Sequence, residues 1–221
     1  MQSHLALLHT TPVLIDAFDR LIEEADLEFR VKHIVEEEFL TEAREKGISQ
    51  DLDGRIRGRI GAAIEEGAAV VLCTCSTIGA SAESANDAAD GVVIRVDRPM
   101  AEKAVETGSR IIVAAALEST LAPTRNLILE VASTRKKRID LIEVLCDNAW
   151  SRLEDGDNEG YLSEIARTLR ERASEGDVIV LAQASMAGAA DLCPEISIPI
   201  LSSPEIGFQY AVDIWKEKGG C

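Results

Sequence analysis

Two stretches of this sequence, EGAAVVLCTCSTIGA at residues 66–80 and EGDVIVLAQASMAGA at residues 175–189, repeat one pattern. The second stretch begins 109 residues after the first, which is close to half of the 221-residue chain. Each contains an apolar run typical of a buried parallel strand, followed by small and hydroxyl-bearing residues that open a helix. The repeat predicts two similar α/β lobes, although two unrelated strand–helix units could also resemble each other by chance.

Outside these stretches, short apolar runs rich in β-branched residues alternate with helical patterns. This alternation predicts βαβ units, parallel sheets and helices on both faces of each sheet. We expect a first lobe at residues 1–96 together with 205–221, and a second lobe at 97–204. The expected strands are 5–9, 28–35, 69–75, 92–96, 110–115, 139–145, 178–182 and 198–201. The expected helices are 12–24, 49–66, 77–88, 99–107, 123–136, 161–173, 186–192 and 205–218.

The charge balance argues against two classes of partner. The chain has 23 Lys and Arg against 39 Asp and Glu, a formal net charge of −16. Such a surface repels phosphate backbones and anionic membranes, so we expect neither nucleic acid nor a membrane as partner. The basic run at residues 135–138 is the one concentrated positive patch in the sequence. We interpret it as the cationic C-terminus of a helix.

Two further features of the sequence bear on location. No apolar run approaches the ~20 residues that a spanning helix needs, and the N-terminus lacks the positive region of a signal peptide. The cysteines number five, an odd count, and stand at positions 73, 75, 146, 193 and 221. Because they are scattered, we expect reduced thiols in a cytoplasmic protein.

The helix expected at 49–66 contains three glycines, Gly54, Gly58 and Gly61. Each costs up to about 1 kcal/mol relative to alanine inside a helix, so we expect that they allow close packing against a neighbouring element. A phosphate-binding loop is not indicated, because neither common glycine-rich phosphate motif occurs here.

Cys75 closes the strand expected at 69–75 and stands directly before a helix. A helix N-terminus carries partial positive charge and unpaired N–H groups, so we expect a lowered thiol pKa. The same N–H groups, with the hydroxyls of Ser76 and Thr77, could hold a substrate carboxylate. Structurally, Cys75 could instead be a small buried residue and Thr77 a helix cap. Cys73, two positions earlier, is expected in the core.

Other chemistries fit the sequence poorly. A Cys-x-Cys pair without a nearby histidine or second cysteine pair is a weak metal signal, so no metal is expected. Ser76 lacks the flanking glycines of a hydrolase nucleophile elbow, and no histidine follows residue 33. The order of residues does not exclude a Cys-His protease, but no protease signature surrounds Cys75.

Hydroxyl-bearing residues also follow the first strand of each half. Thr10 and Thr11 end the strand at 5–9, and Ser119 and Thr120 follow the strand at 110–115. These hydroxyls could bind a ligand. Thr11, directly before Pro12, is explained equally well as a helix cap.

These residues together resemble the aspartate/glutamate racemase superfamily, over most of the chain. Cys75-Ser76-Thr77 is similar to the family's Cys-Asn-Thr motif. The segment LAQASMA at 181–187 is similar to the Leu-Gly-Cys-Ala-Gly-Met-Ala segment of its hydantoin racemase branch. The resemblance implies two α/β lobes related by a pseudo-twofold axis, an active site in the cleft between them, and no cofactor. It also implies a homodimer or higher homo-oligomer, because dimers are common in that family.

In that family, two cysteines on opposite faces of the substrate's α-carbon remove and return its proton. The first of them corresponds to Cys75. The motif match places Gln183 at the second position, whereas the ungapped repeat places Ala184 there; neither is a thiol, and Cys193 lies too far along the chain. Arylmalonate decarboxylase, a relative in this superfamily, needs one thiol, which protonates the carbanion left by loss of carbon dioxide. Its thiol belongs to the second lobe, whereas Cys75 belongs to the first.

We therefore expect a cofactor-independent enzyme with one-thiol acid/base chemistry at the carbon next to a carboxylate of a small molecule. The reaction would be of the racemase/isomerase or decarboxylase type, with Cys75 transferring the proton. The expected substrate-binding residues are Thr10, Thr11, Ser76, Thr77, Ser119, Thr120, Gln183 and Ser185. No Arg or Lys is recognisably placed for a distal substrate group.

Two alternatives remain open at this point. One is a small-carboxylate binding protein that has no catalytic activity. The other is a true racemase whose second acid/base group comes from elsewhere, such as His9 or Glu118.

Overall fold

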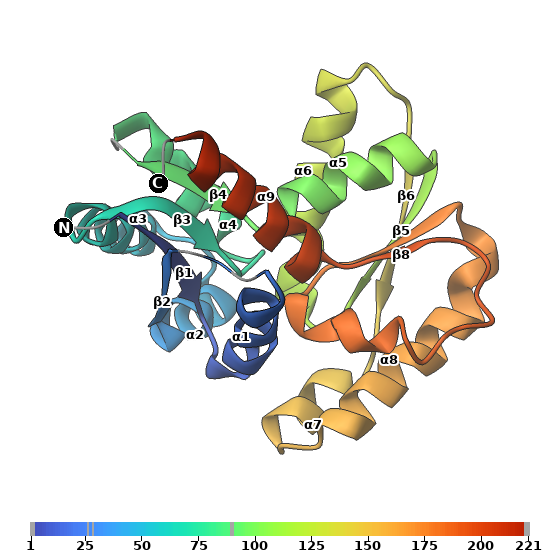
Figure 1. Cartoon of the computed structure of the whole chain (residues 1–221). Coiled ribbons are helices and arrows are strands. Elements are labelled where there is room, and N and C mark those ends of the chain that lie inside the picture. Colours follow the sequence, from blue (N-terminus) through green and yellow to red (C-terminus); the bar gives the residue numbers. More distant parts are fainter. Residues whose placement is uncertain (1–2, 26, 28, 89–90, 219–221) are drawn as a thin grey trace. The chain divides into compact units, whose positions relative to one another are not determined.

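A computed structural model of the chain describes residues 3–25, 27, 29–88 and 91–218. It divides into two compact units, one comprising Met1–Val96 with Pro204–Cys221 and the other Asp97–Ser203 (Figure 1). Each unit holds a four-stranded sheet in which every pairing is parallel. The prediction of two similar lobes, each a parallel sheet flanked by helices, is confirmed.

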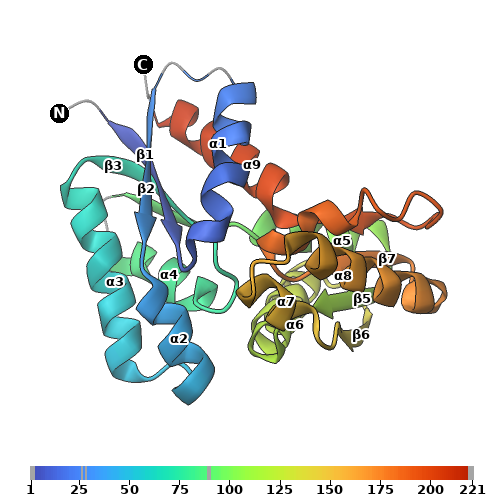
Figure 2. The same ribbon diagram turned by 90° about the horizontal axis from the view of Figure 1, so that it is seen from below.

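The sheet of the first unit has the order β2-β1-β3-β4. Helices α1 and α9 cover one face, and α2, α3 and α4 cover the other (Figure 2). The strands are β1 (His4–His9), β2 (Arg30–Val35), β3 (Ala68–Cys73) and β4 (Val92–Arg95). The helices are α1 (Ile15–Glu24), α2 (Glu37–Lys46), α3 (Gln50–Glu65), α4 (Gly79–Ser84) and α9 (Ser203–Glu217), with 3-10 turns η1 (Pro12–Leu14) and η2 (Ala85–Ala88).

The second unit repeats this arrangement, with the order β6-β5-β7-β8. Helices α5 and α6 pack on one face of the sheet, and α7 and α8 pack on the other. The strands are β5 (Arg110–Ala115), β6 (Asp140–Leu145), β7 (Val178–Leu181) and β8 (Ile200–Leu201). The helices are α5 (Arg98–Thr107), α6 (Glu118–Thr134), α7 (Ala149–Glu154) and α8 (Asn158–Arg172), with 3-10 turns η3 (Ala173–Glu175) and η4 (Ala184–Ala189).

The repeated stretches explain this correspondence. Strands β3 and β7 are the third strands of their sheets, each next to the first strand of its half. Both are continuous apolar runs, because helices cover both faces of each sheet.

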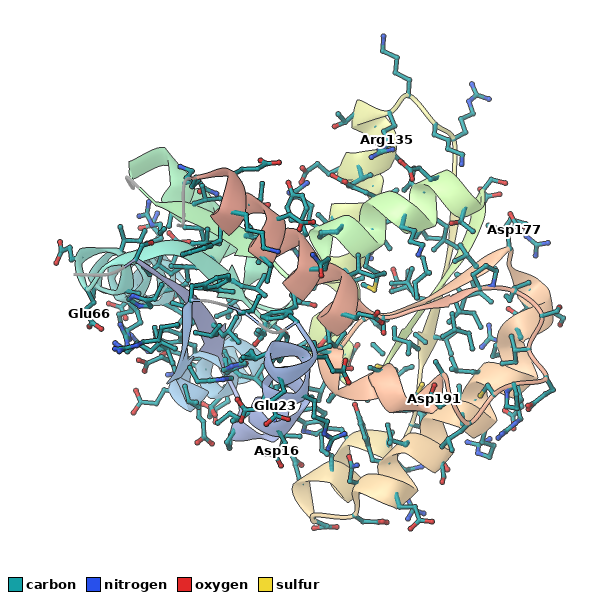
Figure 3. All side chains as sticks on the ribbon, viewed as in Figure 1. Asp16, Glu23, Glu66, Arg135, Asp177 and Asp191 are labelled. Carbon is teal, nitrogen blue, oxygen red and sulfur yellow. The ribbon has the colours of Figure 1, made fainter. Side chains whose placement is uncertain are left out.

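Asp177, directly before β7, joins this strand to the start of β5. Its Oδ2 accepts hydrogen bonds from the backbone N–H groups of Ser109 at 2.9 Å and Arg110 at 2.8 Å (Figure 3).

Several elements differ from the sequence expectation. Helices α2 and α7 were not predicted; α2 is mostly charged and buries only Phe39, Leu40 and Ala43. Helix α6 begins at Glu118 instead of residue 123, so that Pro123 lies inside it. The helix expected at 77–88 is the short α4 followed by a 3-10 turn, and that expected at 186–192 is the 3-10 turn η4. Strand β3 ends at Cys73, two residues early, and β8 has only two residues.

Some expectations fall partly outside the described residues. These are the start of the strand expected at 28–35, the tail of the lobe segment 205–221, and Cys221.

The expected close packing at the α3 glycines is wrong. A Cβ added at Gly54, Gly58 or Gly61 would meet nothing within 4 Å. These glycines therefore permit no close approach in this structure, and their cost to the helix is uncompensated there.

The basic run ends a helix, as predicted. Helix α6 ends at Thr134, and the Arg135 guanidinium forms ion pairs with Glu102 and Glu106 of α5 (Figure 3). The Lys137 ammonium donates to the Glu106 carbonyl at 3.1 Å. Within the described part of the chain, no helix is long and apolar enough to cross a membrane.

Candidate active site

Cys75 lies in the turn that joins β3 to α4, at the carboxyl end of the strand. The backbone N–H of Thr74 still donates to the Leu8 carbonyl at 3.0 Å, so β1 and β3 stay paired up to this point. The chain then turns through residues 76–78, and the Gly79 N–H donates to the Ser76 carbonyl at 3.2 Å. The N-cap residue of α4 is Ile78, so Thr77 is not the helix cap.

The Cys75 sulfur is surrounded by hydrogen-bond donors. It accepts from the hydroxyls of Thr10 and Thr77 and from the backbone N–H groups of Thr77 and Ile78. Burial raises the pKa of the Cys75 thiol, and these four hydrogen bonds lower it by less, so that the net shift is upward. The expected lowered pKa is therefore wrong for the free protein, because the loss of hydration outweighs the donors.

The other predicted residues of this unit follow β1 or β3 and differ in their roles. Thr10, Ser76 and Thr77 are buried. The Thr11 hydroxyl accepts a 3.4 Å hydrogen bond from the Val13 N–H, so it caps the first 3-10 turn. Thr10, directly before it, is the threonine that reaches the sulfur.

Arg95 is a residue near this turn that the sequence analysis missed. It ends β4, pairs with Cys73 in the sheet register, and is only 3% exposed. An added Cβ on Gly79 would lie 2.9 Å from Arg95 Nε, so the guanidinium packs against the first residue of α4. The sequence does carry a signal for this residue: Arg95 interrupts the apolar run at 92–96, and a cation rarely occurs on a buried strand.

In the second unit, the sheet register identifies the counterpart of Cys75. Leu8, fifth in β1, pairs with Cys73, and Ala114, fifth in β5, pairs with Leu181. Cys75 stands two residues after Cys73, and Gln183 stands two residues after Leu181. Gln183 therefore corresponds to Cys75. The register thus favours Gln183 over Ala184, because the ungapped repeat that gave Ala184 is one residue out of register.

Gln183 uses its carboxamide oxygen within its own unit. Oε1 accepts hydrogen bonds from the backbone N–H groups of Ala116 at 2.6 Å and Leu117 at 3.1 Å. These are the N–H groups of the turn after β5, so that turn has two fewer donors to offer a ligand.

The remaining predicted residues lie near Gln183 in sequence or on the adjoining helix. Ser119 and Thr120 are in the first turn of α6, and Ser119 Oγ is buried without a hydrogen-bond partner among the described residues. The Ser185 hydroxyl is 2.8 Å from the hydroxyl of Tyr161, a fully buried residue of α8.

Comparison with solved structures places this architecture among known folds. No protein-family model matches the chain, and no curated protein sequence matches it. Allantoin racemase from Klebsiella pneumoniae is similar at a TM-score of 0.71 and 15% identity, covering 98% of this chain and 89% of the racemase. Glutamate racemase from Francisella tularensis, in complex with D-glutamate, is similar at a TM-score of 0.75 and 13% identity, covering 99% and 83%.

The chain has the fold of the aspartate/glutamate racemases. A mutant of arylmalonate decarboxylase in a sulfate-associated form shares it, at a TM-score of 0.61 and 14% identity over 96% of this chain and 92% of the decarboxylase. The resemblance inferred from the sequence is thus confirmed at the level of the fold.

Within this racemase fold, Cys75 differs from the other described cysteines. Cys73, Cys146 and Cys193 are buried, whereas Cys75 is partly exposed. Cys73 is in the core, as predicted. Burial raises the pKa of Cys146 to about 11, and the Cys193 thiol donates to the Ala166 carbonyl at 3.6 Å inside the second core. Neither occupies the turn that carries Gln183.

Of the two alternative second bases, His9 is fully buried and has both ring nitrogens in hydrogen bonds. It has no nitrogen left for a substrate in this arrangement. Glu118 is exposed at the start of α6. Among the described residues, no group of three or more His, Cys, Asp or Glu side chains is arranged to hold a metal ion.

Proposed function

We propose that this protein is a cofactor-independent enzyme that transfers a proton at the carbon next to a carboxylate of a small molecule. The main support is the surrounding of the Cys75 sulfur. Four hydrogen bonds, from Thr10, Thr77 and Ile78, lower the pKa of one partly exposed thiol in the turn after a buried strand. A neutral thiol is a weak acceptor, so a cradle of this kind favours a site in which the sulfur becomes anionic.

The raised pKa of Cys75 determines which role comes first. At neutral pH the resting thiol is protonated, so it begins the cycle as an acid. This favours the decarboxylase type of reaction over racemisation. The bond from the α-carbon to the leaving carboxylate breaks, its electron pair remains on the α-carbon as an enediolate, and carbon dioxide departs. The Sγ proton then moves to the α-carbon and leaves a thiolate, which water reprotonates.

The chemistry of Gln183 also supports a reaction that uses one thiol. A carboxamide is neither an ordinary acid nor a base, and its oxygen is already bound to two backbone N–H groups. We assign it an orienting role, through its amide N–H groups.

The hydroxyls of the predicted site residues, including the two that donate to the sulfur in the free protein, are proposed to bind the substrate carboxylate and the developing enediolate, where one well-placed donor contributes about 3–4 kcal/mol. They belong to Thr10, Thr11, Ser76, Thr77, Ser119, Thr120 and Ser185.

Isotope incorporation tests this proposal directly. The protein is incubated in D₂O with amino acids, hydantoins and substituted malonates, and the C–H signals are followed by NMR. We expect deuterium at the α-carbon of at least one product, a loss of at least 100-fold in Cys75→Ala, and little change in the matched control Cys193→Ala. Equal turnover in Cys75→Ala and wild type would refute the catalytic role of Cys75.

The non-catalytic binding protein remains the second candidate, because Gln183 stands at the position corresponding to Cys75. The same panel separates the two candidates when calorimetric titration is added. A binding protein would bind a small carboxylate, lose affinity in Thr77→Ala, and incorporate no deuterium.

We also propose a cytoplasmic location, which is consistent with the four free cysteines of the described residues.

A further inference from the structure

A chain of polar side chains runs across the sheet of the first unit, behind Cys75. His9 Nδ1 is 2.8 Å from the Thr74 hydroxyl, and His9 Nε2 is 2.9 Å from His33 Nδ1. His33 Nε2 is in turn 3.1 Å from Asp19 Oδ1 on α1. His9 is fully buried, whereas the Asp19 side chain is 52% exposed, so the chain connects the sheet interior to solvent.

Counting protons along this chain shows that neutral histidines cannot complete it. Besides its contact with His9, the Thr74 hydroxyl lies 3.2 Å from the Leu8 carbonyl, which can only accept. Thr74 must give its one proton to Leu8 and accept from His9 Nδ1–H. At the other end, the Asp19 carboxylate can only accept from His33. All four contacts are hydrogen bonds at once only when the two histidines together carry three protons instead of two.

The extra proton belongs on His33. Burial, and then the neighbouring His33, lower the pKa of His9 to about 4, so His9 stays neutral. His33 is the histidine that contacts the carboxylate, with Nε2 3.1 Å from Asp19 Oδ1. The ring of His9 otherwise meets Phe18 of α1, which contacts Phe208 of α9.

The other charged side chains on the elements around this chain of contacts are exposed. Figure 3 shows two of them, Asp16 and Glu23, on α1. The full set on β2, α1 and α9 is Arg30, Lys32, Asp16, Arg20, Glu23, Glu24, Glu205, Asp213, Lys216 and Glu217.

The chain of contacts ends beside the proposed catalytic turn. His9 directly precedes Thr10, and Thr74 directly precedes Cys75. Since successive side chains of a strand point to opposite faces, His9 and Thr74 meet on one face of the sheet, and Thr10 meets the Cys75 sulfur on the other. The bond between His9 and Thr74 therefore fixes the two strand ends that bring Thr10 to the thiol.

We propose that Asp19, His33 and His9 are positioning residues that hold Cys75 in place through Thr74. We call these four hydrogen-bonded side chains, from Asp19 to Thr74, the clamp. The clamp is complete only while its two histidines together carry the extra proton. Histidine gains and loses such a proton between about pH 5 and 8. The clamp closes as the pH falls through that range. When it opens, Thr74 gives up one bond and the Cys75 turn loosens. The catalytic consequence rests on the proposed function, but the clamp itself does not.

The test follows the reactivity of the Cys75 thiol without any substrate. Mass spectrometry measures alkylation of Cys75 by iodoacetamide from pH 5 to 9, and NMR follows the ring ¹⁵N signals of His33. In wild type we expect the alkylation profile to contain an extra inflection at the pH where the histidine pair loses its extra proton. Asp19→Asn removes the stabilising charge and should move both transitions downward by up to about one pH unit, whereas Asp16→Asn, on the same helix, should move neither.

Thr74→Val provides the second variant, with a side chain of the same shape. It should abolish the inflection in the alkylation profile while the ring ¹⁵N signals of His33 still change with pH. The proposal is wrong if the Asp19→Asn profile superimposes on wild type, or if Thr74→Val retains the inflection. Because no substrate is involved, a protein that turns over nothing would refute the proposed function and leave this result unaffected.

Discussion

At the scale of single residues, Gln183 illustrates how a side chain can satisfy the N–H groups of a neighbouring turn. Its Oε1 binds the Ala116 and Leu117 N–H groups at the end of β5. Gln183→Ala would leave both N–H groups without an acceptor, and a buried unsatisfied group costs about 1–3 kcal/mol. We expect a loss of about 2 kcal/mol in the free energy of unfolding, measured by urea denaturation.

Gln183→Glu is the matched control for that substitution. The carboxylate keeps an acceptor oxygen in the same place, so we expect a clearly smaller loss than in Gln183→Ala. If both variants lose the same stability, the two hydrogen bonds contribute little and shape alone explains the position.

Some residues of the candidate site could be predicted from the sequence, because the strands before them have a clear local pattern. Cys75, Thr10 and Gln183 follow buried parallel strands, and the carboxyl ends of such strands meet at one edge of a sheet. The direction of the Cys75 pKa shift was not predictable in this way. It depends on how much water the packed neighbours remove, and a one-dimensional pattern carries no information on that. Arg95 was missed because its contact with Gly79 joins two separate elements.

At the scale of elements, the two halves differ in how well their patterns were detected. The buried strands β1, β3, β5 and β7 were predicted to within two residues, because continuous apolar runs are unambiguous. The largely polar surface of α2 gives no helix signal, and Pro123 indicates a later start for α6 than the structure has. Proline near a helix start is favoured at the first position, but here the helix includes one further turn before it.

Helix α9 gives a prediction at this scale, because its packing depends on one glycine. A Cβ added to Gly207 would lie 2.3 Å from the Val96 carbonyl oxygen, and backbone cannot yield as a side chain can. We therefore expect Gly207→Ala to lower the free energy of unfolding by about 3 kcal/mol, near the upper end of overpacking costs. Gly58→Ala in α3 has open space around the new methyl group and should instead raise stability by up to about 1 kcal/mol.

Thermal unfolding of both alanine variants against wild type checks this pair. Opposite signs are the expected result. A Gly207→Ala protein as stable as wild type would mean that α9 does not pack against Val96 as described.

At the scale of the whole molecule, buried titratable groups predict how stability depends on pH. His9 has a pKa of about 4 in the folded chain, against an ordinary value of 6.5. Between these values the unfolded chain binds the proton and the folded chain does not, so stability falls as the pH drops from about 6.5 to 4. One pKa unit corresponds to 1.36 kcal/mol, which gives a loss of about 3 kcal/mol by pH 4.

The alkaline side follows from the opposite sign. Burial raises the pKa of Cys146 from 9.0 to about 11, and it also raises the pKa values of Cys75, Cys193 and Tyr161. Above about pH 9 the unfolded chain releases protons that the folded chain retains, so stability falls with rising pH. Cys146 alone contributes a loss of about 2 kcal/mol by pH 11.

Urea titrations from pH 4 to 11 should therefore show a plateau between about pH 6.5 and 9, with a decline on each side. His9→Gln should flatten the acid limb, because it removes the group that must charge on unfolding. Cys146→Ala should flatten the alkaline limb in the same way, after an overall loss from the cavity it leaves. If the alkaline limb is as steep in Cys146→Ala as in wild type, the buried thiol is not the group that titrates, and the fold of the second unit must be opened by another ionisation.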